Sequence, residues 1–423
     1  MALPRDPALD ATLAFLREGF LFVGNRCRAL GSDAFVTRMM MTRVVCMRGE
    51  EAARFFYGGG RFTRKGALPQ ITLRLLQDKG SVDWLDGAAH RQRKAMFLNL
   101  LAADAPERIA DLLEDEWRRA LPTWQARGEI RLDEAAAQLL CRAACTWAGV
   151  PLGEDEVAQR ASELREMFDS AGSPGPKGVR ALLLRQRSER WARGLIDRAR
   201  AGKVGADTPL AVIAAHRDEK GRLLSRKIAG VELLNLLRPT VAVARFITFS
   251  AHALHKLPQW RGRLASGDRA TAEMFVQEVR RLYPFFPVIA GRALQRLEWK
   301  GHRFAPGDWV MLDLYGTNHD PRLWVEPESF WPERFMRWGG AGFALVPQGA
   351  GDPRNDHRCP GEAATVALMM RAVRLLTGAM TYDVPEQDLS IDLGRMPAVP
   401  KSRFVMSNIV PATSTAAADA TAA

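Results

Sequence analysis

Apolar residues recur at helical spacing along most of the chain. Residues 106–128 and 132–149 repeat apolar positions three and four apart and end at glycine, which is typical of amphipathic helices. Residues 362–380 also show one apolar face and a closing glycine. The Gly/Pro-rich stretch 170–178 is short enough to be a loop within one fold. The pattern therefore predicts a mainly α-helical chain.

Two regions depart from this helical pattern. Residues 34–49 favour short strands, and residues 286–315 consist of short β-prone pieces. A turn at residues 306–308, Pro-Gly-Asp, separates two of these pieces. We therefore expect a mainly α fold with a small β subdomain.

The longest apolar stretch, residues 231–254, is long enough to cross a bilayer. Its charged residues Glu232, Arg238 and Arg245 argue against a membrane span and favour a helix through the middle of a large soluble core. Pro239 follows Arg238 at the centre of this helix, where it removes one backbone hydrogen bond and is expected to kink or open the preceding turn.

The composition is that of a folded globular protein, with 47% hydrophobic and 26% charged residues in a chain of 423. We expect a single domain over residues 1–411 and a disordered Ala/Thr-rich tail over residues 412–423. The first thirty residues carry acids and prolines ahead of a short apolar run, so neither a secretory signal nor a membrane anchor fits. A cytoplasmic protein without a transmembrane segment is the expectation.

The net charge of +12 indicates either acidic partners or a basic surface. Much of it lies in residues 180–203, where leucines and basic residues alternate at helical spacing, as on the solvated face of an amphipathic helix. An anionic membrane surface is an alternative partner. Because no nucleic-acid-binding module accompanies the charge, we expect no nucleic acid partner.

The five cysteines are an odd number, widely spaced and without a CxxC pair, which excludes a disulfide framework or a zinc site. Cys141 and Cys145 lie four apart and suit a helix core. Cys359 differs because it precedes a predicted helix with Pro360 near the helix start. The field of a helix N-terminus favours the thiolate, which can act as a nucleophile, a redox thiol or a metal ligand.

The segment "HRCPGE", which follows a glycine-rich stretch, resembles the haem-binding loop of the cytochrome P450 superfamily. The resemblance implies that Cys359 is the axial thiolate ligand of a haem b iron and that His357 contacts a haem propionate. It also implies that Gly349, Gly351 and Gly361 let the backbone approach the porphyrin. The spacing from Gly351 to Cys359 is longer than in most of the superfamily.

Further matches occur in the family's order along the chain. The "EVRR" segment places Glu278 and Arg281 in ExxR spacing, and Arg334 of "WPERF" is the usual third partner of that pair. The "DGAAHRQRK" segment places His90 and Lys94 one turn apart, like the family's propionate-binding pair. The resemblance also makes Arg64 a candidate propionate partner.

The centre of the long apolar helix lacks the acid and alcohol that deliver protons in O₂-using members. The chain has "LLRPT" there, so a fixed cation, Arg238, stands where a proton donor is expected. A buried guanidinium needs an anion. Either a protein carboxylate supplies it, as a structural ion pair, or the substrate does.

The "LLRPT" segment resembles one branch of the superfamily, the bacterial fatty-acid peroxygenases. The resemblance implies that Arg238 binds the carboxylate of a fatty acid substrate and that Pro239 shapes the helix beside it. Hydrogen peroxide is then the oxidant, and no redox partner is required. The implied products are 2-hydroxy or 3-hydroxy acids, with loss of CO₂ to a terminal alkene as a competing outcome.

One position departs from that branch. Its members have glutamine or histidine on the distal side of the haem, where this chain places Asp83. An aspartate there can repel the substrate, carry protons or point elsewhere, so α-hydroxylation, β-hydroxylation and decarboxylation all stay open. Two rival hypotheses are an O₂-dependent monooxygenase fed by a ferredoxin and a non-enzymatic haem-binding or fatty-acid-binding protein.

Overall fold

The computed structural model describes residues 3–172, 175–339 and 342–412. It confirms the predicted mainly α fold with a small β subdomain. Apart from Ala412, the predicted disordered tail lies outside the described residues, and its boundary stays a prediction.

The helices account for most of the described chain and agree with the sequence periodicity. They are α1 (Thr12–Glu18), α2 (Phe22–Ala29), α3 (Glu50–Tyr57), α4 (Gln70–Leu76), α5 (Gly87–Leu100), α6 (Ala105–Arg127), α7 (Leu132–Ala148), α8 (Val157–Asp169), α9 (Pro176–Arg200), α10 (Pro209–Ala215), α11 (Arg226–Ala242), α12 (Ala244–Lys256), α13 (Gln259–Ala265), α14 (Arg269–Leu282), α15 (Leu314–Asn318) and α16 (Glu362–Arg374).

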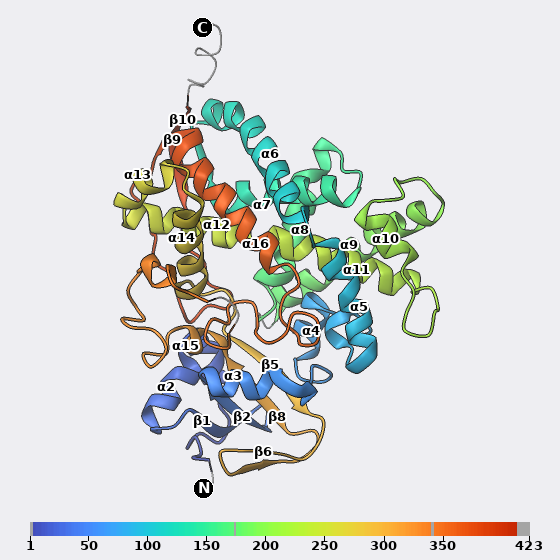
Figure 1. The fold of residues 1–423 in the computed structure, drawn as a ribbon, viewed down its shortest axis with the longest axis vertical. Helices are drawn as coiled ribbons and strands as arrows, with labels where there is room; N and C mark the ends of the chain where they lie inside the picture. Colours follow the sequence, from blue (N-terminus) through green and yellow to red (C-terminus); the bar gives the residue numbers. More distant parts are fainter. Residues whose placement is uncertain (1–2, 173–174, 340–341, 413–423) are drawn as a thin grey trace, which may run out of the picture.

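Three small sheets complete the fold. The largest has the order β1 (Ala34–Met39), β2 (Thr42–Arg48), β8 (Trp309–Asp313), β5 (Val288–Ala293) and β3 (Phe62–Thr63), with β2 and β8 parallel and the other pairs antiparallel. The others are β4 (Glu129–Arg131), β10 (Val405–Pro411) and β9 (Met380–Asp383), and the hairpin β6 (Leu297–Trp299) and β7 (His302–Phe304). Figure 1 shows the five-stranded sheet at one end of the molecule and most helices beyond it.

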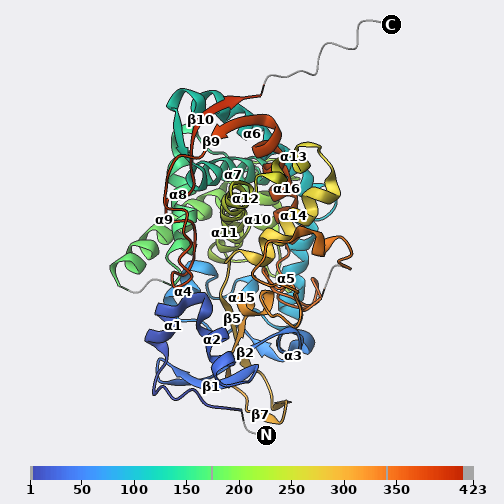
Figure 2. The ribbon, with the colours of Figure 1, turned by 90° about the vertical axis from the view of Figure 1, so that its left-hand side faces the viewer.

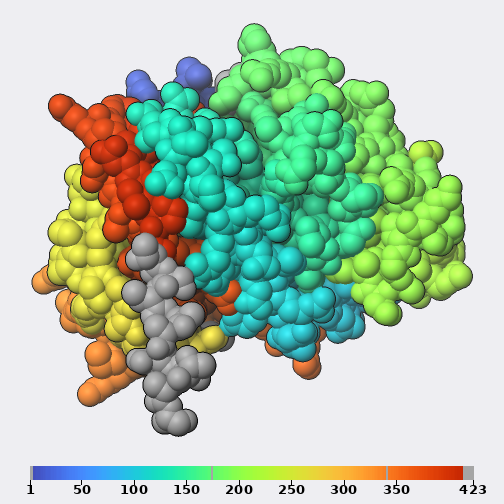
Figure 3. All heavy atoms as spheres, turned by 90° about the horizontal axis from the view of Figure 1, so that it is seen from above, coloured from blue at the N-terminus to red at the C-terminus, as the bar shows by residue number. Residues whose placement is uncertain are grey.

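Helices α11 and α12 form the centre of the helical part. Figure 2 shows them between α8 and α9 on one side and α14 and α16 on the other. Seen from above, the C-terminal segment that carries β9 and β10 lies against α6 (Figure 3). Nearly all side chains of α12 are buried, which confirms the predicted helix through a large core.

The interruption of this central helix falls after Pro239 rather than before it. Helix α11 is continuous through Pro239 to Ala242, and α12 begins at Ala244. The amide of Val243 donates to the Thr240 carbonyl at 3.2 Å, a tighter turn than the α-helical bond it would make to residue 239. The preceding turn therefore does not open, and Arg238 keeps a helical position.

A buried ion triad fixes α14 to the segment that leads toward the cysteine loop. Two guanidinium nitrogens of Arg281 donate to the two oxygens of Glu278 at 2.7 and 2.8 Å, and Arg334 Nε lies 3.2 Å from Glu278 Oε2. Neither Glu278 nor Arg281 is exposed at all. The structure thus brings together the three residues of the predicted ExxR triad.

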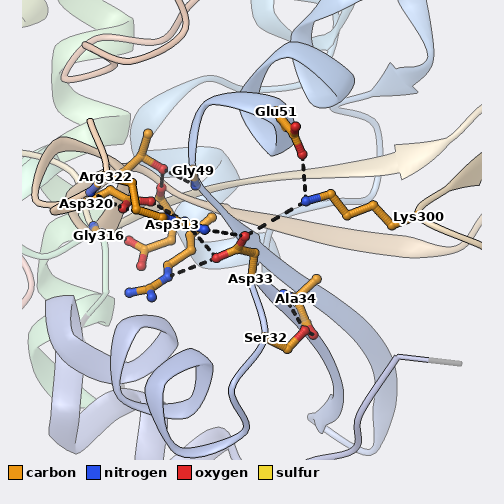
Figure 4. Close-up of polar contacts among 12 residues, drawn as sticks. Ser32, Asp33, Ala34, Gly49, Glu51, Lys300, Asp313, Gly316, Asp320 and Arg322 are labelled. Carbon is orange, nitrogen blue, oxygen red and sulfur yellow. Dashed lines mark hydrogen bonds and ion pairs between the residues drawn. The ribbon is translucent and has the colours of Figure 1, made fainter. Parts of the chain in front are cut away.

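A second polar network, largely at the surface, holds the sheet end together (Figure 4). Arg322 donates to both oxygens of Asp33 at 2.8 Å, and Lys300 lies 2.6 Å from Glu51 and 3.9 Å from Asp33. Asp313 caps α15 by accepting the Gly316 amide at 2.7 Å. Exposed pairs of this kind contribute little individually, in contrast to the buried triad.

No helix in the described parts of the chain combines the length and apolar character that a membrane span requires.

We predict that Glu278→Gln lowers the free energy of unfolding by about 3–5 kcal/mol, because it leaves two arginines in the triad without their shared carboxylate. Urea denaturation followed by circular dichroism measures this change. The control is Glu51→Gln, which removes an exposed partner of Lys300 and should leave the denaturation midpoint unchanged. Equal stability of the two variants would show that the triad is not a major source of stability.

Candidate functional site

Cys359 lies in the loop directly before α16. Its amide donates to the Gln348 carbonyl at 3.1 Å, which holds the loop back against the preceding segment. Gly361 is the N-cap residue of α16, so the cysteine precedes the helix by three positions. Among the described cysteines, Cys359 alone is partly accessible, and the other four are buried.

The residues that lengthen the spacing between Gly351 and Cys359 form a turn, which is held by hydrogen bonds within the turn. Asp352 Oδ1 accepts the amides of Arg354 and Asn355 at 2.8 Å, and Asp356 Oδ2 accepts the amide of Asp352 at 2.8 Å. Gly351 has a φ of +90°, and a Cβ there would lie 2.4 Å from Asp356 Oδ2. This glycine is therefore required by the turn itself.

The Cys359 thiol does not become a thiolate through the helix field alone. Burial raises its pKa to about 11, and the N–H of Gly361 offsets only part of this effect. The N–H of Gly361 acts in the direction expected of a helix N-terminus, and desolvation acts against it. Gln348 Nε2 also lies 3.8 Å from Sγ, so the sulfur has donors suited to a thiolate once a metal ion displaces the proton.

Four basic side chains gather beside this loop, and we call them the basic cluster: Arg64, His90, Lys94 and His357. The rings of His90 and His357 are 4.1 Å apart between centroids. Lys94 Nζ donates to the carbonyls of Asp356 and, at 2.6 Å, Arg358. Arg64 Nη1 donates to a carbonyl of β5 at 2.7 Å. The structure thus brings together all four predicted propionate-binding residues.

None of the four side chains of the basic cluster lies within ion-pair distance of a carboxylate in the described residues, although Asp86 and Asp356 line the same small pocket as three of them. Burial lowers the pKa of His90 to about 4 and that of Lys94 to about 8. Burial also lowers the pKa of Arg64 and of His357, and for His357 the neighbouring cations of the cluster add to the effect. Three members line a small pocket together with Tyr57. The donor set therefore fits an anionic group such as the two carboxylates of a haem.

Arg238 is buried on α11. Its Nη1 donates to the Leu75 carbonyl and its Nη2 to Asn235 Oδ1, both at 3.2 Å. No carboxylate of the described residues lies within ion-pair distance of it. Burial, followed by repulsion from Arg185, lowers the pKa of Arg238 to about 9. Of the two alternatives from the sequence, a structural ion pair is thus not seen among the described residues.

Pro239 and Asp83 are the other two predicted site residues, and they differ in exposure: Pro239 is exposed and Asp83 is half-buried. Pro239 is exposed although Arg238 and Val241 are buried, so an accessible space reaches this face of α11. Asp83 lies in the short 3₁₀ turn Val82–Trp84. Burial raises the pKa of Asp83, and the charges of Arg238, Arg64 and Lys94 partly offset this. Its carboxylate therefore acts on both Arg238 and the basic cluster.

The sequence reasoning missed four residues that support the cysteine loop. Glu362 pairs with Arg280 and accepts Arg358 Nε at 2.6 Å, while Arg280 Nη2 donates to Gln348 Oε1 at 3.0 Å. These contacts hold the start of α16 and the loop against α14. The signals in the sequence were the arginine inside "EVRR" and the acid directly after "CPG".

Comparisons with known proteins agree with this geometry. The family model "Cytochrome P450" matches residues 268–377. Among curated proteins, "Cytochrome P450 84A4" of Arabidopsis thaliana is 29% identical over 136 residues, which are 31% of this chain and 26% of that protein. "Vinorine hydroxylase" of Rauvolfia serpentina is 31% identical over 148 residues, 33% and 30% of the two chains. The chain spans less than a third of the length of these relatives.

Solved structures match over nearly the whole chain. Cytochrome P450SP alpha (CYP152B1) is 46% identical with a TM-score of 0.93, covering 96% of this chain and 100% of that one. Cytochrome P450EX alpha (CYP152N1) with myristic acid is 40% identical with a TM-score of 0.93, covering 97% and 100%. A variant of cytochrome P450 OleT in complex with arachidonic acid is 32% identical with a TM-score of 0.94, covering 98% and 100%.

We predict that Lys94→Met weakens haem binding by about tenfold or more, because a buried cation of the basic cluster is lost. Haem retained per protein after gel filtration measures the effect. Lys94→Arg keeps the charge and should restore much of the binding, whereas Lys401→Met removes an exposed lysine and should change nothing. Full haem retention by Lys94→Met would exclude a role of Lys94 in holding the cofactor.

Proposed function

The chain belongs to the cytochrome P450 superfamily and to its CYP152 group, and from this premise we propose that it is a haem-thiolate fatty-acid peroxygenase. It uses hydrogen peroxide to hydroxylate long-chain fatty acids at Cα or Cβ, with loss of CO₂ to a terminal alkene as the competing outcome. The myristic and arachidonic acids bound in two of the similar structures support this class of substrate.

The observation that carries the proposal is that Arg238 is buried and has no carboxylate within ion-pair distance among the described residues. An uncompensated charge in a protein interior is costly, and a fatty acid carboxylate removes that cost when it binds. A guanidinium and a carboxylate also form two parallel hydrogen bonds, which fix the orientation of the acid. Arg238 therefore selects ligands by their carboxylate.

The cofactor is a haem with a cysteine thiolate ligand. Cys359 supplies the thiolate, and the basic cluster is placed to hold the two propionates. A thiolate-ligated haem, when bound, supplies the oxidising chemistry, and electron donation from the thiolate favours cleavage of the O–O bond of the peroxide. Gly361 and Gln348 stabilise the charge on the sulfur through their N–H groups.

Regioselectivity follows from where the carboxylate is held. With the acid group fixed at Arg238 beside the accessible face of α11, the first carbons of the chain are those nearest the reacting centre. The bound carboxylate also takes the place of the acid that O₂-using members carry, because it can hold and pass on a proton. Pro239 shapes the wall against which this end of the substrate lies.

The alternative, an O₂-dependent monooxygenase fed by a ferredoxin, is not favoured. It requires an acid and an alcohol in the central helix, and α11 has Arg238 and Pro239 there. The Arg238 guanidinium stays charged at neutral pH even with its pKa lowered to about 9, so it does not replace that acid.

We predict that purified, haem-loaded protein converts myristic acid to hydroxy acid or alkene with hydrogen peroxide and no reductant, with products identified by mass spectrometry. Arg238→Ala should lose this activity by at least about tenfold, because the carboxylate loses a charged partner. Arg238→Lys keeps the charge without the paired hydrogen bonds. Its activity should lie between that of the parent and that of Arg238→Ala. Turnover with ferredoxin and reductant but none with peroxide would instead establish the monooxygenase.

We also predict that Asp83→Asn tightens fatty acid binding at neutral pH, by about tenfold, because Asp83 competes with the substrate for Arg238. Burial raises the pKa of Asp83, so its ionised form is disfavoured in the folded protein and stability falls as pH rises through that pKa. The variant should therefore unfold at a higher temperature than the parent at neutral pH.

This difference in stability should narrow as the pH is lowered toward the pKa, where Asp83 takes up a proton. Binding titrations with myristate and thermal unfolding across pH measure both effects. Unchanged affinity and stability would show that the Asp83 carboxylate does not act on Arg238.

A further inference from the structure

Asn235 connects Arg238 to a charged group deeper in the core. It lies one helical turn before Arg238 on α11, and its Oδ1 accepts a hydrogen bond from Arg238 Nη2 at 3.2 Å. Its Nδ2 donates to Glu232 Oε2 at 3.0 Å. A single side-chain amide thus joins the guanidinium to a buried carboxylate.

The chemistry of the two neighbours allows the amide one orientation. The carboxylate of Glu232 only accepts hydrogen bonds, and the guanidinium of Arg238 only donates them. Rotating the Asn235 amide by half a turn would place oxygen against oxygen and N–H against N–H. The hydrogen bonds to Glu232 and Arg238 together therefore keep the acceptor of the amide facing Arg238.

Glu232 is held by a residue of α5, the helix that carries His90 and Lys94 of the basic cluster. Arg93 Nη1 lies 2.7 Å from Glu232 Oε1, and the exposed fractions of the two side chains are 4% and 0%. Arg93 belongs to α5, directly before Lys94 of the basic cluster. A continuous series of polar contacts thus runs from the helix beside the cofactor, through Glu232 and Asn235, to Arg238.

The second acceptor of Arg238, the carbonyl of Leu75, cannot hold the guanidinium in place alone. The Leu75 carbonyl accepts from Arg238 Nη1 at 3.2 Å, but Arg185 Nη1 also donates to it at 3.4 Å. Arg185 is buried and repels Arg238, as the lowered pKa of Arg238 reflects. Asn235 Oδ1 is the acceptor that Arg238 does not share with this second cation.

We propose that Asn235 is a positioning residue that holds the Arg238 guanidinium ready for a carboxylate, and that the Arg93–Glu232 ion pair orients Asn235 for this task. The inference rests on the proposed function of Arg238. An arginine side chain held in its binding geometry loses less entropy when the ligand arrives, so the network contributes to affinity without contacting the substrate. It also couples the position of the substrate clamp to that of α5.

The test is a double-mutant cycle between Asn235→Ala and Arg238→Ala in haem-loaded protein. The main readout is ligand binding, followed by the haem absorption spectrum, with myristate and with myristyl alcohol, which lacks the carboxylate. Asn235→Ala should weaken myristate binding by about tenfold and leave the alcohol nearly unaffected. Its effect should vanish in the Arg238→Ala background, because the two residues act through one interaction. In steady-state turnover, KM should rise more than kcat falls.

Two further variants separate positioning from stability. Ser250→Ala removes a buried hydroxyl that bonds within α12, and it should leave myristate binding unchanged. The double replacement Arg93→Met with Glu232→Met removes both charges together, which avoids leaving one of them unpaired. It should keep the fold, as thermal unfolding reports, and weaken myristate binding as Asn235→Ala does.

The outcomes distinguish the two proposals. If Asn235→Ala binds myristate as the parent does, or if its effect simply adds to that of Arg238→Ala, Asn235 does not act through Arg238 and the inference is wrong. If the parent binds myristate and Arg238→Ala binds it equally well, the proposed function of Arg238 fails first.

Discussion

A buried guanidinium without a carboxylate partner among the described residues is the constraint on which this site depends. Removing a charge from water costs several kcal/mol even in a relaxed protein interior, so Arg238 destabilises the chain unless an anion arrives. The fold makes this tolerable by providing two neutral acceptors, the Leu75 carbonyl and Asn235. Neutral acceptors reduce the desolvation cost of Arg238 without neutralising its charge. An anionic ligand that pairs with Arg238 therefore still gains electrostatic energy.

Three other buried arginines are arranged differently. Arg93, Arg245 and Arg281 each lie within ion-pair distance of a carboxylate in the described chain. The sequence supplies acids for these structural roles and none for Arg238. The difference therefore separates arginines that hold the fold together from Arg238 and Arg64, which have no carboxylate within ion-pair distance among the described residues and which we propose to bind ligands, a distinction that burial alone cannot make.

Much of the architecture was predictable because it depends on local patterns. Helical periodicity located α6 and α7 to within a residue or two, and the spacing of Glu278 and Arg281 indicated their ion pair. The desolvation of the Cys359 thiol, which raises its pKa, was not predictable, because it depends on segments that are distant in the sequence. The "ELLNLLR" spacing shows residues 232, 235 and 238 on one helix face, but not that Arg93, far away in sequence, fixes them.

The site contains two regions that attract anions, and they are not equivalent. The basic cluster has four side chains, three of which line a small pocket, and suits two propionates, whereas Arg238 has neutral hydrogen-bond partners and suits one carboxylate. Asp83 acts on both regions and opposes a third negative charge between them. In the proposed function, the propionates neutralise the basic cluster and leave Arg238 as the position that attracts a fatty acid. The contacts through Glu232 and Asn235 link this position to α5, the helix that carries His90 and Lys94 of the basic cluster.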